Sequence, residues 1–254
     1  MNLSQPNASS ASARSPSIAL DALQLREEHL PFTVRVVGTE EDLRKAIYIR
    51  HAAYSRHVPE FAASLVLPEE ADRNPGSVVL LAESKVDGSP LGTMRIQTNQ
   101  FAPLRLEESV PLPSWLAGLR LAEATRLGVT EDRAGRLVKT VLFKAFYLYC
   151  LHNGIDWMVI TARAPLDRMY ERLLFNDVHP GMGYVPIKHV GGMPHRVMCF
   201  DVAEAERNWR KAGHPLAGFM FDTLHPDLNV SARNGETSQA PAKARLGGTE
   251  LVFS

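Results

Sequence analysis

Aliphatic and β-branched residues gather in short segments along the chain, and turn residues separate these segments. The segments 77–83 (SVVLLAE) and 91–98 (LGTMRIQT) have this composition, which is typical of β-strands. Between them, Asp87 and Gly88 form a dipeptide that is typical of a tight hairpin turn. The same pattern predicts further strands at 32–37, 119–129, 156–161, 183–186 and 195–201.

Other segments carry apolar residues at helical spacing. Thr39, with Asp42 three residues later, resembles a capping box and predicts a helix over about 40–56. A longer helix over about 136–153 is apolar on most sides, so it must pack against a sheet. A third helix is predicted over 165–175, beginning with a proline. Helices around a mixed sheet with a crossover connection indicate the α+β class.

Both ends of the chain differ in composition from its middle. Residues 1–30 begin with a stretch rich in Ser, Ala, Asn and Pro, which has too few large apolar groups to offset the entropy cost of ordering. We therefore predict a disordered or loosely ordered N-terminal tail over 1–30, one folded domain over 31–229 and a disordered C-terminal tail over 230–254.

The overall composition excludes several classes of protein. Lys plus Arg and Asp plus Glu number 28 each, and a net charge of zero argues against a nucleic-acid-coating protein. No apolar run reaches about 18 residues, so no transmembrane helix is expected, and the N-terminus lacks the apolar core of a secretory signal. Cys150 and Cys199 are isolated in apolar runs, which predicts two buried thiols and is compatible with a cytoplasmic location. The histidines show no metal-ligand spacing, and no metal site is predicted.

Five charged residues stand out because they lie in or beside apolar segments: Arg50, Asp72, Arg95, Glu123 and Arg126. Burying an unpaired charge is costly, so charges inside the strands of a small sheet need partners. Arginines and carboxylates in similar numbers can form a closed ion-pair network. Such a network is either purely structural or the polar wall of an active site.

A second candidate site follows the strand that ends at Val129. There the loop TEDRAG leads into the long helix, whose first N–H groups can bind a phosphate. Arg133 and Arg136 flank this position, but Gly135 is its single glycine. An ordinary strand-to-helix turn with solvated charges remains the alternative.

Four segments together resemble the acyl-homoserine-lactone synthases and the related long-chain N-acyl amino acid synthases, which belong to the GNAT superfamily of acyltransferases. The resemblance covers about residues 32–202. The four segments occur in the family's order: the helix IYIRHAAYSRHVPEF, the acidic loop and strand LPEEADRNPGSVVLLAE, the Arg-bearing strand GTMRIQTNQFAPLRLEESVPLP, and the Glu-x-x-Arg strand RLAEATRLGV.

The resemblance implies a GNAT-like fold, in which helices flank a mixed central sheet with a bulged and splayed central strand. It also implies an N-acyltransferase that moves a long acyl chain from an acyl carrier protein thioester to the amine of an amino acid. The N-acyl amino acid synthase branch is favoured because Tyr54 and Phe61 stand where lactone synthases usually carry Trp as well as Phe.

The donor implied is an acyl-phosphopantetheine thioester on a carrier protein or on coenzyme A, with no tightly bound cofactor. The sparse glycine loop fits a carrier protein, which brings one phosphodiester in place of the 3′-phospho-ADP of coenzyme A. The other partner implied is a small amino acid or amine, and the acyl product could bring peripheral membrane association.

The resemblance also implies roles for individual residues. Glu123 is the expected general base, and Arg95 and Arg126 are expected to orient it or to bind the acceptor's carboxylate. Regular alternation would put Glu123 and Arg126 on opposite faces of the strand, so they share one site only if a bulge intervenes. The remaining expected contacts are Arg50, Tyr54, Asp72, Thr125 and Leu127 with the substrate, and Val129, Arg133, Gly135 and Arg136 with the donor.

Three other functions stay open at this stage. The chain could be a GNAT N-acyltransferase that depends on coenzyme A, or a lactone synthase. It could also be a binding module that keeps the fold and senses an acyl thioester without catalysis. The presence of Glu123 together with Arg95 and Arg126 favours an enzyme, because a binding module has no need of the base.

Overall fold

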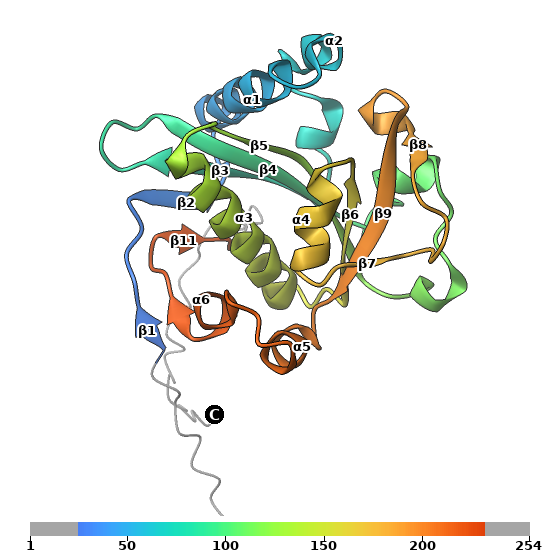
Figure 1. Cartoon of the computed structure of the whole chain (residues 1–254). Helices are drawn as coiled ribbons and strands as arrows, with labels where there is room; N and C mark the ends of the chain where they lie inside the picture. The colour runs from blue at the N-terminus through green and yellow to red at the C-terminus, as the bar shows by residue number, and fades with distance from the viewer. Residues whose placement is uncertain (1–24, 232–254) are drawn as a thin grey trace, which may run out of the picture.

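A mixed sheet of nine strands runs through the centre of the protein (Figure 1). The computed structural model describes residues 25–231. The order across the sheet is β11-β2-β3-β4-β5-β6-β9-β7, and β8 pairs with β9 beside this path. The strands are β2 (Phe32–Val36), β3 (Ser77–Ser84), β4 (Pro90–Thr98), β5 (Leu121–Val129), β6 (Trp157–Ala162), β7 (Asn176–Asp177), β8 (Val185–Ile187), β9 (Met193–Asp201) and β11 (Leu228–Asn229).

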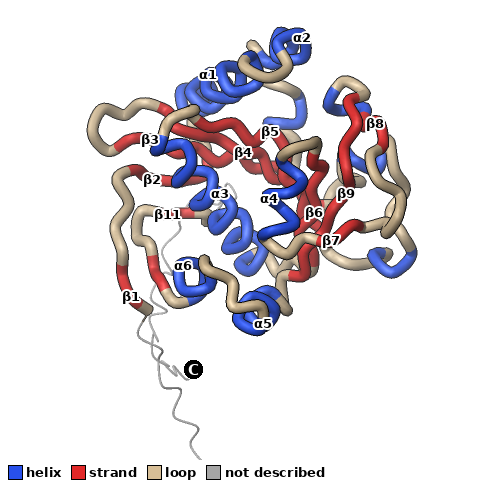
Figure 2. The backbone as a smooth tube through the Cα atoms, in the orientation of Figure 1, coloured by secondary structure: helices blue, strands red, loops and turns tan. Residues whose placement is uncertain are grey.

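Helices cover both faces of this sheet (Figure 2). Side chains alternate along β3, so Leu80 and Ala82 pack into the cluster under α3, while Val79 and Leu81 pack against α1. The helix α4 lies beside α3, and α5 and α6 close the lower end of the view (Figure 1). The helices are α1 (Glu40–Ser55), α2 (Pro59–Ala62), α3 (Arg133–His152), α4 (Leu166–Arg172), α5 (Ala205–Lys211) and α6 (Ala217–Phe221).

The local signals in the sequence have the expected structural consequences. The Thr39 hydroxyl caps α1 by accepting a hydrogen bond from the Asp42 N–H at 3.1 Å. The long apolar helix packs on the sheet as expected, and Cys150 and Cys199 are both buried free thiols. Helix α3 begins at Arg133, three residues earlier than expected, because Asp132 caps its first turn.

The described fold extends beyond the predicted domain of residues 31–229. The short strand β1 (Arg26–Glu27) pairs with β10 (Thr223–Leu224), and Val230 is buried in the main core. Strands of two residues carry no recognisable alternation, which explains why β1, β7, β10 and β11 were not predicted. The predicted tails over 1–24 and 232–254 lie outside the described residues.

The centre of the sheet opens between β5 and β6. These parallel strands pair only from Leu121 with Trp157 to Ala124 with Ile160. Beyond that point β5 continues to Val129 and β6 to Ala162 without pairing to each other. The two strand ends therefore diverge, and the backbone groups of β5 past Ala124 have no partner in β6.

A β-bulge lies in β5 at the same level. Thr93 pairs with Gly128 and Arg95 with Thr125, so Arg126 and Leu127 together face the single residue Met94. Arg126 has a φ of 55°, which is uncommon for a residue other than glycine. The bulged and splayed central strand that the resemblance implied is therefore present. Among residues 25–231, no helix is both long and apolar enough to cross a bilayer.

Candidate active site

Three arginines and two carboxylates meet on the α1 face of the sheet, and we call this group the arginine–carboxylate cluster. Arg50 of α1 donates two hydrogen bonds to Asp72, at 2.9 and 2.8 Å. Arg95 of β4 donates to both Glu69 and Asp72 at 3.1 Å. Because Arg50 and Arg95 are fully buried, these contacts take place away from water.

The fifth member of the cluster, Arg126, is held in place by its side chain. Its guanidinium donates to both oxygens of Glu69, at 2.6 and 2.5 Å, and to the carbonyl of His189 at 3.0 Å. The ring of Phe61 lies 5.2 Å from the guanidinium carbon. A left-handed conformation at a residue other than glycine costs on the order of 1–3 kcal/mol. We attribute its stability here to these contacts, which fix the bulge.

Both carboxylates of the cluster remain ionised. Burial would raise the pKa of Asp72, but the hydrogen bonds and charge of Arg50 outweigh it and hold the pKa below its usual range. The same balance, with Arg126 as the main partner, lowers the pKa of Glu69. Three guanidiniums against two carboxylates leave one positive charge in excess within the cluster.

Glu123 lies on the same face but outside the hydrogen bonds of the cluster. It is fully buried, accepts a hydrogen bond from the Leu106 N–H at 3.2 Å, and has one oxygen 3.6 Å from Nε2 of His189. Burial raises the pKa of Glu123 to about 7 and lowers that of His189 to about 3. His189 is therefore neutral, and Glu123 holds its proton to an unusually high pH.

The raised pKa of Glu123 makes stability depend on pH in a defined direction. The carboxyl of Glu123 has an ordinary pKa of 4.5 in the unfolded chain and a pKa of about 7 in the folded protein. Its contribution to the free energy of unfolding is therefore complete below pH 4.5. That contribution, about 3 kcal/mol, is lost as the pH rises through 7. We expect the free energy of unfolding of the wild type, relative to that of Glu123→Gln, to fall by about 3 kcal/mol between pH 4.5 and pH 8. Urea titrations of both proteins across this pH range measure the difference.

The lowered pKa of His189 acts in the opposite direction on both proteins, so taking the difference between them isolates Glu123. A difference that stays constant over this pH range would show that folding leaves the pKa of Glu123 unchanged.

A cavity of about 230 Å³ opens where β5 and β6 diverge, and we call it the α1-side cavity. Its walls come from the C-terminal end of α1, the unpaired end of β5, the ends of β6 and β9, and residues of α3, α4 and the 3₁₀ turn at Lys188–Val190. The residues of these walls with polar side chains are Tyr54, Arg56, His57, Thr125, Arg126, Lys139, Thr161, Arg163, Tyr170, His189 and His195.

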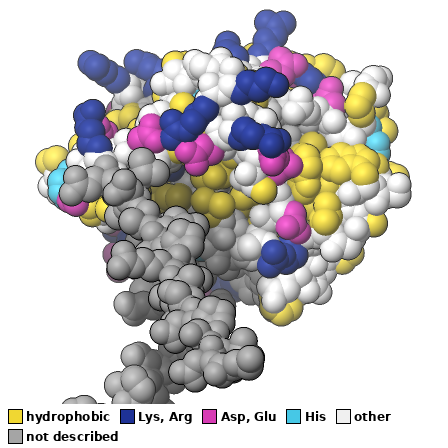
Figure 3. All heavy atoms as spheres, turned by 90° about the horizontal axis from the view of Figure 1, so that it is seen from below, with side chains coloured by type: hydrophobic (Ala, Val, Ile, Leu, Met, Phe, Trp, Pro, Cys, Tyr) yellow, Lys and Arg dark blue, Asp and Glu magenta, His cyan; other side chains and the backbone are white. Residues whose placement is uncertain are grey.

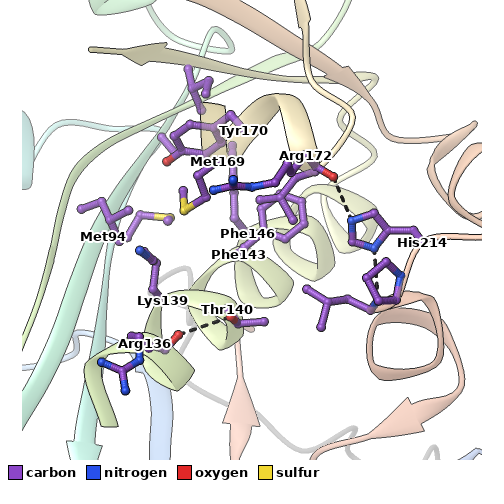
Figure 4. A pocket seen from close by; sticks show the side chains of 16 residues that line it. Met94, Arg136, Lys139, Thr140, Phe143, Phe146, Met169, Tyr170, Arg172 and His214 are labelled. Atoms are coloured by element: carbon purple, nitrogen blue, oxygen red, sulfur yellow. Dashed lines mark hydrogen bonds between the residues drawn. The ribbon is translucent and has the colours of Figure 1, made fainter. Parts of the chain in front are cut away.

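A second cavity of about 340 Å³ lies between α3, α4 and the sheet, and we call it the α3-side cavity. Figure 4 shows Lys139 at one end of it, His214 at the other, and Phe143 and Phe146 between them. His214 is held by a 2.9 Å hydrogen bond to the carbonyl of Arg172. Most of the wall is apolar: Met94, Ala124, Leu127, Phe143, Phe146, Ile160, Met169, Leu173, Pro215 and Leu216.

The two cavities share four residues, Ala124, Leu127, Lys139 and Tyr170. Ala124 is the last residue of β5 that pairs with β6, and Leu127 belongs to the bulge. The cavities are therefore neighbours at the point where the strands splay, one mainly apolar and one with many polar groups.

The start of α3 differs from an open phosphate-binding loop. Asp132 caps the helix by accepting a hydrogen bond from the Gly135 N–H at 2.8 Å. A side chain at Gly135 would approach the Thr130 carbonyl to 1.9 Å, so only glycine fits there. Arg133 and Arg136 are exposed on this turn. One of the free N–H groups is thus already occupied by a carboxylate.

The structure distributes the sequence-predicted residues among these features. The residues Tyr54, Thr125, Arg126, Leu127 and Val129 line the α1-side cavity, and Arg136 lines the α3-side cavity. The residues Arg50, Asp72, Arg95, Glu123, Arg133 and Gly135 line neither of the two.

Several residues near the site were not singled out from the sequence. Glu69 was grouped with Glu70 and Asp72 in an acidic loop, and nothing in the loop distinguishes the carboxylate that turns inward. Lys139, Arg163, His189 and His195 come from four different segments that only the fold brings together. Among the described residues, no three His, Cys, Asp or Glu side chains cluster as metal ligands.

A known protein family matches the part of the chain that contains these features. The family model described as N-acyl amino acid synthase FeeM matches residues 41–188, which include the whole cluster, the bulge and both splayed strands. The chain belongs to the FeeM family of N-acyl amino acid synthases. It is therefore an acyltransferase, as its sequence motifs implied.

Among the solved structures that resemble this chain, FeeM shares its fold. FeeM from uncultured soil microbes, an N-acyl amino acid synthase, is 20% identical over 74% of this chain and 97% of that chain, with a TM-score of 0.55. BjaI, a CoA-dependent acyl-homoserine lactone synthase, is 17% identical over 76% and 93%, with a TM-score of 0.49. A putative N-acetyltransferase from Lactobacillus plantarum is 12% identical over 68% and 99%, with a TM-score of 0.49. A comparison with curated protein sequences finds no match. The fold is GNAT-like.

Proposed function

We propose that this protein transfers a long-chain acyl group from a carrier-protein thioester to the α-amino group of an amino acid. The observation that carries the proposal is the pair of neighbouring cavities at the splayed strands. One cavity is mainly apolar and suits an acyl chain, and the other holds cations and polar groups that suit an amino acid. The thioester carbon would lie between them, beside Ala124 and Leu127.

The α3-side cavity has the properties of an acyl-chain site. Its volume of about 340 Å³ falls within the range of small-molecule sites, and its deep wall is formed by aromatic and aliphatic side chains. A hydrocarbon chain buried there gains about 0.8 kcal/mol per methylene. Backbone N–H groups of β5 past Ala124, which have no partner in β6, are available to hold the thioester oxygen.

The α1-side cavity supplies cations for the acceptor's carboxylate. Arg163 and Lys139 line it, are only partly buried, and have no ion-pair partner among residues 25–231. A planar guanidinium binds a carboxylate with two parallel hydrogen bonds, which makes Arg163 the preferred contact. The guanidiniums of Arg95 and Arg126 are instead engaged within the cluster. We assign them, with Arg50 and Asp72, the role of positioning the bulge.

The start of α3 favours a carrier protein over coenzyme A as the donor. Asp132 occupies one N–H group of the turn and brings a negative charge close to where a pyrophosphate would bind. Arg133, Arg136 and Leu137 are exposed side by side, a combination that suits an acidic partner with an apolar contact. A carrier-protein donor also implies a cytoplasmic reaction.

Charges are arranged differently at the other end of the molecule. On the face seen in Figure 3, Lys and Arg side chains are interspersed with Asp and Glu. Arg210 of α5, for example, is paired with Glu206 and Asp222. This mixed face offers less attraction to an acidic protein than the start of α3.

Reversing one charge at the start of α3 should weaken the use of a carrier-protein donor. For Arg133→Glu we expect kcat/KM with acyl carrier protein to fall about tenfold at low salt, because a charge at the rim of an interface acts mainly on association. Activity with an acyl-pantetheine thioester, which lacks the protein, should stay the same. Steady-state kinetics with both donors at two salt concentrations measures the effect.

Lys211→Glu is the matched control, because Lys211 is exposed on α5 at the far end of the molecule (Figure 1). Equal losses in Lys211→Glu and Arg133→Glu would place carrier-protein docking elsewhere.

The function itself is tested by supplying both kinds of donor. The purified protein is incubated with a mixture of amino acids and either a long-chain acyl carrier protein or the matching acyl-coenzyme A, and products are read by mass spectrometry. We expect an N-acyl amino acid from the carrier protein at the higher rate. A product from coenzyme A alone would overturn the choice of donor. No product from either donor, with the protein folded, would favour a binding module.

A further inference from the structure

The acceptor's amine must lose a proton during acyl transfer, yet no carboxylate lines the α1-side cavity. Glu123 is fully buried and does not line this cavity, and both ring nitrogens of His189 are also sealed from solvent. Among the other histidine and tyrosine residues of the wall, His57 is exposed at the end of α1, and burial raises the pKa of Tyr170 well above its usual range. The remaining candidates are Tyr54 and His195.

His195 has the geometry of a base whose tautomer is fixed. Its Nδ1 lies 2.9 Å from the carbonyl of Met193, which only accepts hydrogen bonds, so Nδ1 carries the ring proton. Nε2 is therefore left with a lone pair. Nε2 of His195 has no hydrogen-bond partner among residues 25–231. The two ring nitrogens of His189 also lack partners and are buried, whereas Nε2 of His195 is not fully buried. Since His195 lines the cavity, its free nitrogen is accessible from that side.

The strand register puts His195 on the reacting face of the sheet. Val197 pairs with Thr161, and side chains at every second position of β9 share a face, so His195 and Val197 lie on the same side as Thr161. That face also carries Thr125, which lines the same cavity. His195 lies two residues before Val197 in β9, at the level where the ends of β5 and β6 diverge.

We propose that His195 is the general base of acyl transfer, an inference that rests on the function proposed above. The amine lone pair attacks the thioester carbon, a C–N bond forms, and the proton released by nitrogen passes to Nε2 of His195. The tetrahedral intermediate then collapses, the C–S bond breaks, and the electron pair leaves on the pantetheine sulfur. The imidazolium returns its proton to that sulfur, which leaves as a thiol, and His195 is neutral again.

The electrostatic surroundings of His195 agree with this role. Burial lowers its pKa, and the nearby charge of Arg163 lowers it further. The ring is therefore unprotonated in neutral solution and ready to accept a proton. Arg163 is also the residue that we expect to bind the acceptor's carboxylate, which would bring the amine close to the ring.

The test separates the base from a structural role. In His195→Asn the side-chain amide can still donate to the Met193 carbonyl, but the nitrogen that accepts the proton is absent. We expect kcat to fall by about 10²–10⁴-fold with little change in the KM of the acyl donor. In His195→Ala, added imidazole should restore part of kcat. His152→Asn, on an exposed histidine at the end of α3, should behave as the wild type.

Two results would overturn the assignment. The first is a His195→Asn variant as active as the wild type, and the second is a folded His195→Ala variant whose activity does not respond to imidazole. A wild-type protein that forms no N-acyl amino acid would overturn the proposed function and this role with it. An active wild type with an equally active His195→Asn would overturn the role of His195 alone.

Discussion

Asp72→Asn is expected to destabilise the protein by about 3–5 kcal/mol, because it removes one partner of a buried ion pair. Asp72 accepts two hydrogen bonds from Arg50 and one from Arg95, and both guanidiniums are inaccessible to water. The amide keeps the size of the side chain, but Glu69 is then the single carboxylate of the cluster left to balance three buried guanidiniums. The free energy of unfolding of a protein domain is typically about 5–15 kcal/mol. A loss of this size should therefore produce a large shift in the urea concentration at the midpoint of unfolding.

Glu131→Gln provides the control, since the Glu131 side chain is 79% exposed and its single ion-pair contact is long, at 3.8 Å. Its effect should stay within about 0.5 kcal/mol. If Asp72→Asn were equally mild, water would have to reach the cluster, and the cluster would not be the rigid support of the bulge that we describe.

The second large effect concerns the choice of acyl chain. Thr140 is a half-buried residue of α3 that lines the α3-side cavity (Figure 4). In Thr140→Trp the indole should fill part of the cavity and exclude the end of a long chain. We expect kcat/KM for long-chain donors to fall about fourfold for each excluded methylene, which corresponds to about 0.8 kcal/mol per buried methylene, while medium-chain donors react as before.

Thr140→Val is nearly equal in size to threonine, so it should leave the chain-length profile unchanged. The profile is measured with a series of acyl carrier proteins that differ only in chain length. A uniform loss for all chain lengths in Thr140→Trp would indicate that the chain lies elsewhere.

Much of the fold follows from local patterns in the sequence. The aliphatic segments at 77–83 and 91–98 became β3 and β4, and the capped segment from Thr39 became α1. These elements depend on interactions between residues close in the chain, so their patterns survive folding. Strands of two residues, such as β7 and β11, exist only because a neighbouring strand offers hydrogen bonds, and no local pattern predicts them.

The site was predicted less completely, for reasons that can be stated residue by residue. Regular alternation separates Glu123 from Arg126, and only the register between β4 and β5 reveals the bulge that turns both to one face. Glu69 could not be told apart from Glu70 in the loop. The position of His195 in β9 is that of an ordinary buried residue, and its free nitrogen becomes apparent only from the contact with Met193.

The central claim, that an acyl cavity and an acceptor cavity meet at the splayed strands, is tested most directly by a crystal structure with a bound long-chain N-acyl amino acid. We expect the acyl chain between α3 and α4, against Phe143 and Phe146, and the carboxylate within hydrogen-bond distance of Arg163. The amide bond should lie beside Leu127 and His195. An acyl chain found outside the α3-side cavity, with that cavity left empty, would contradict the claim.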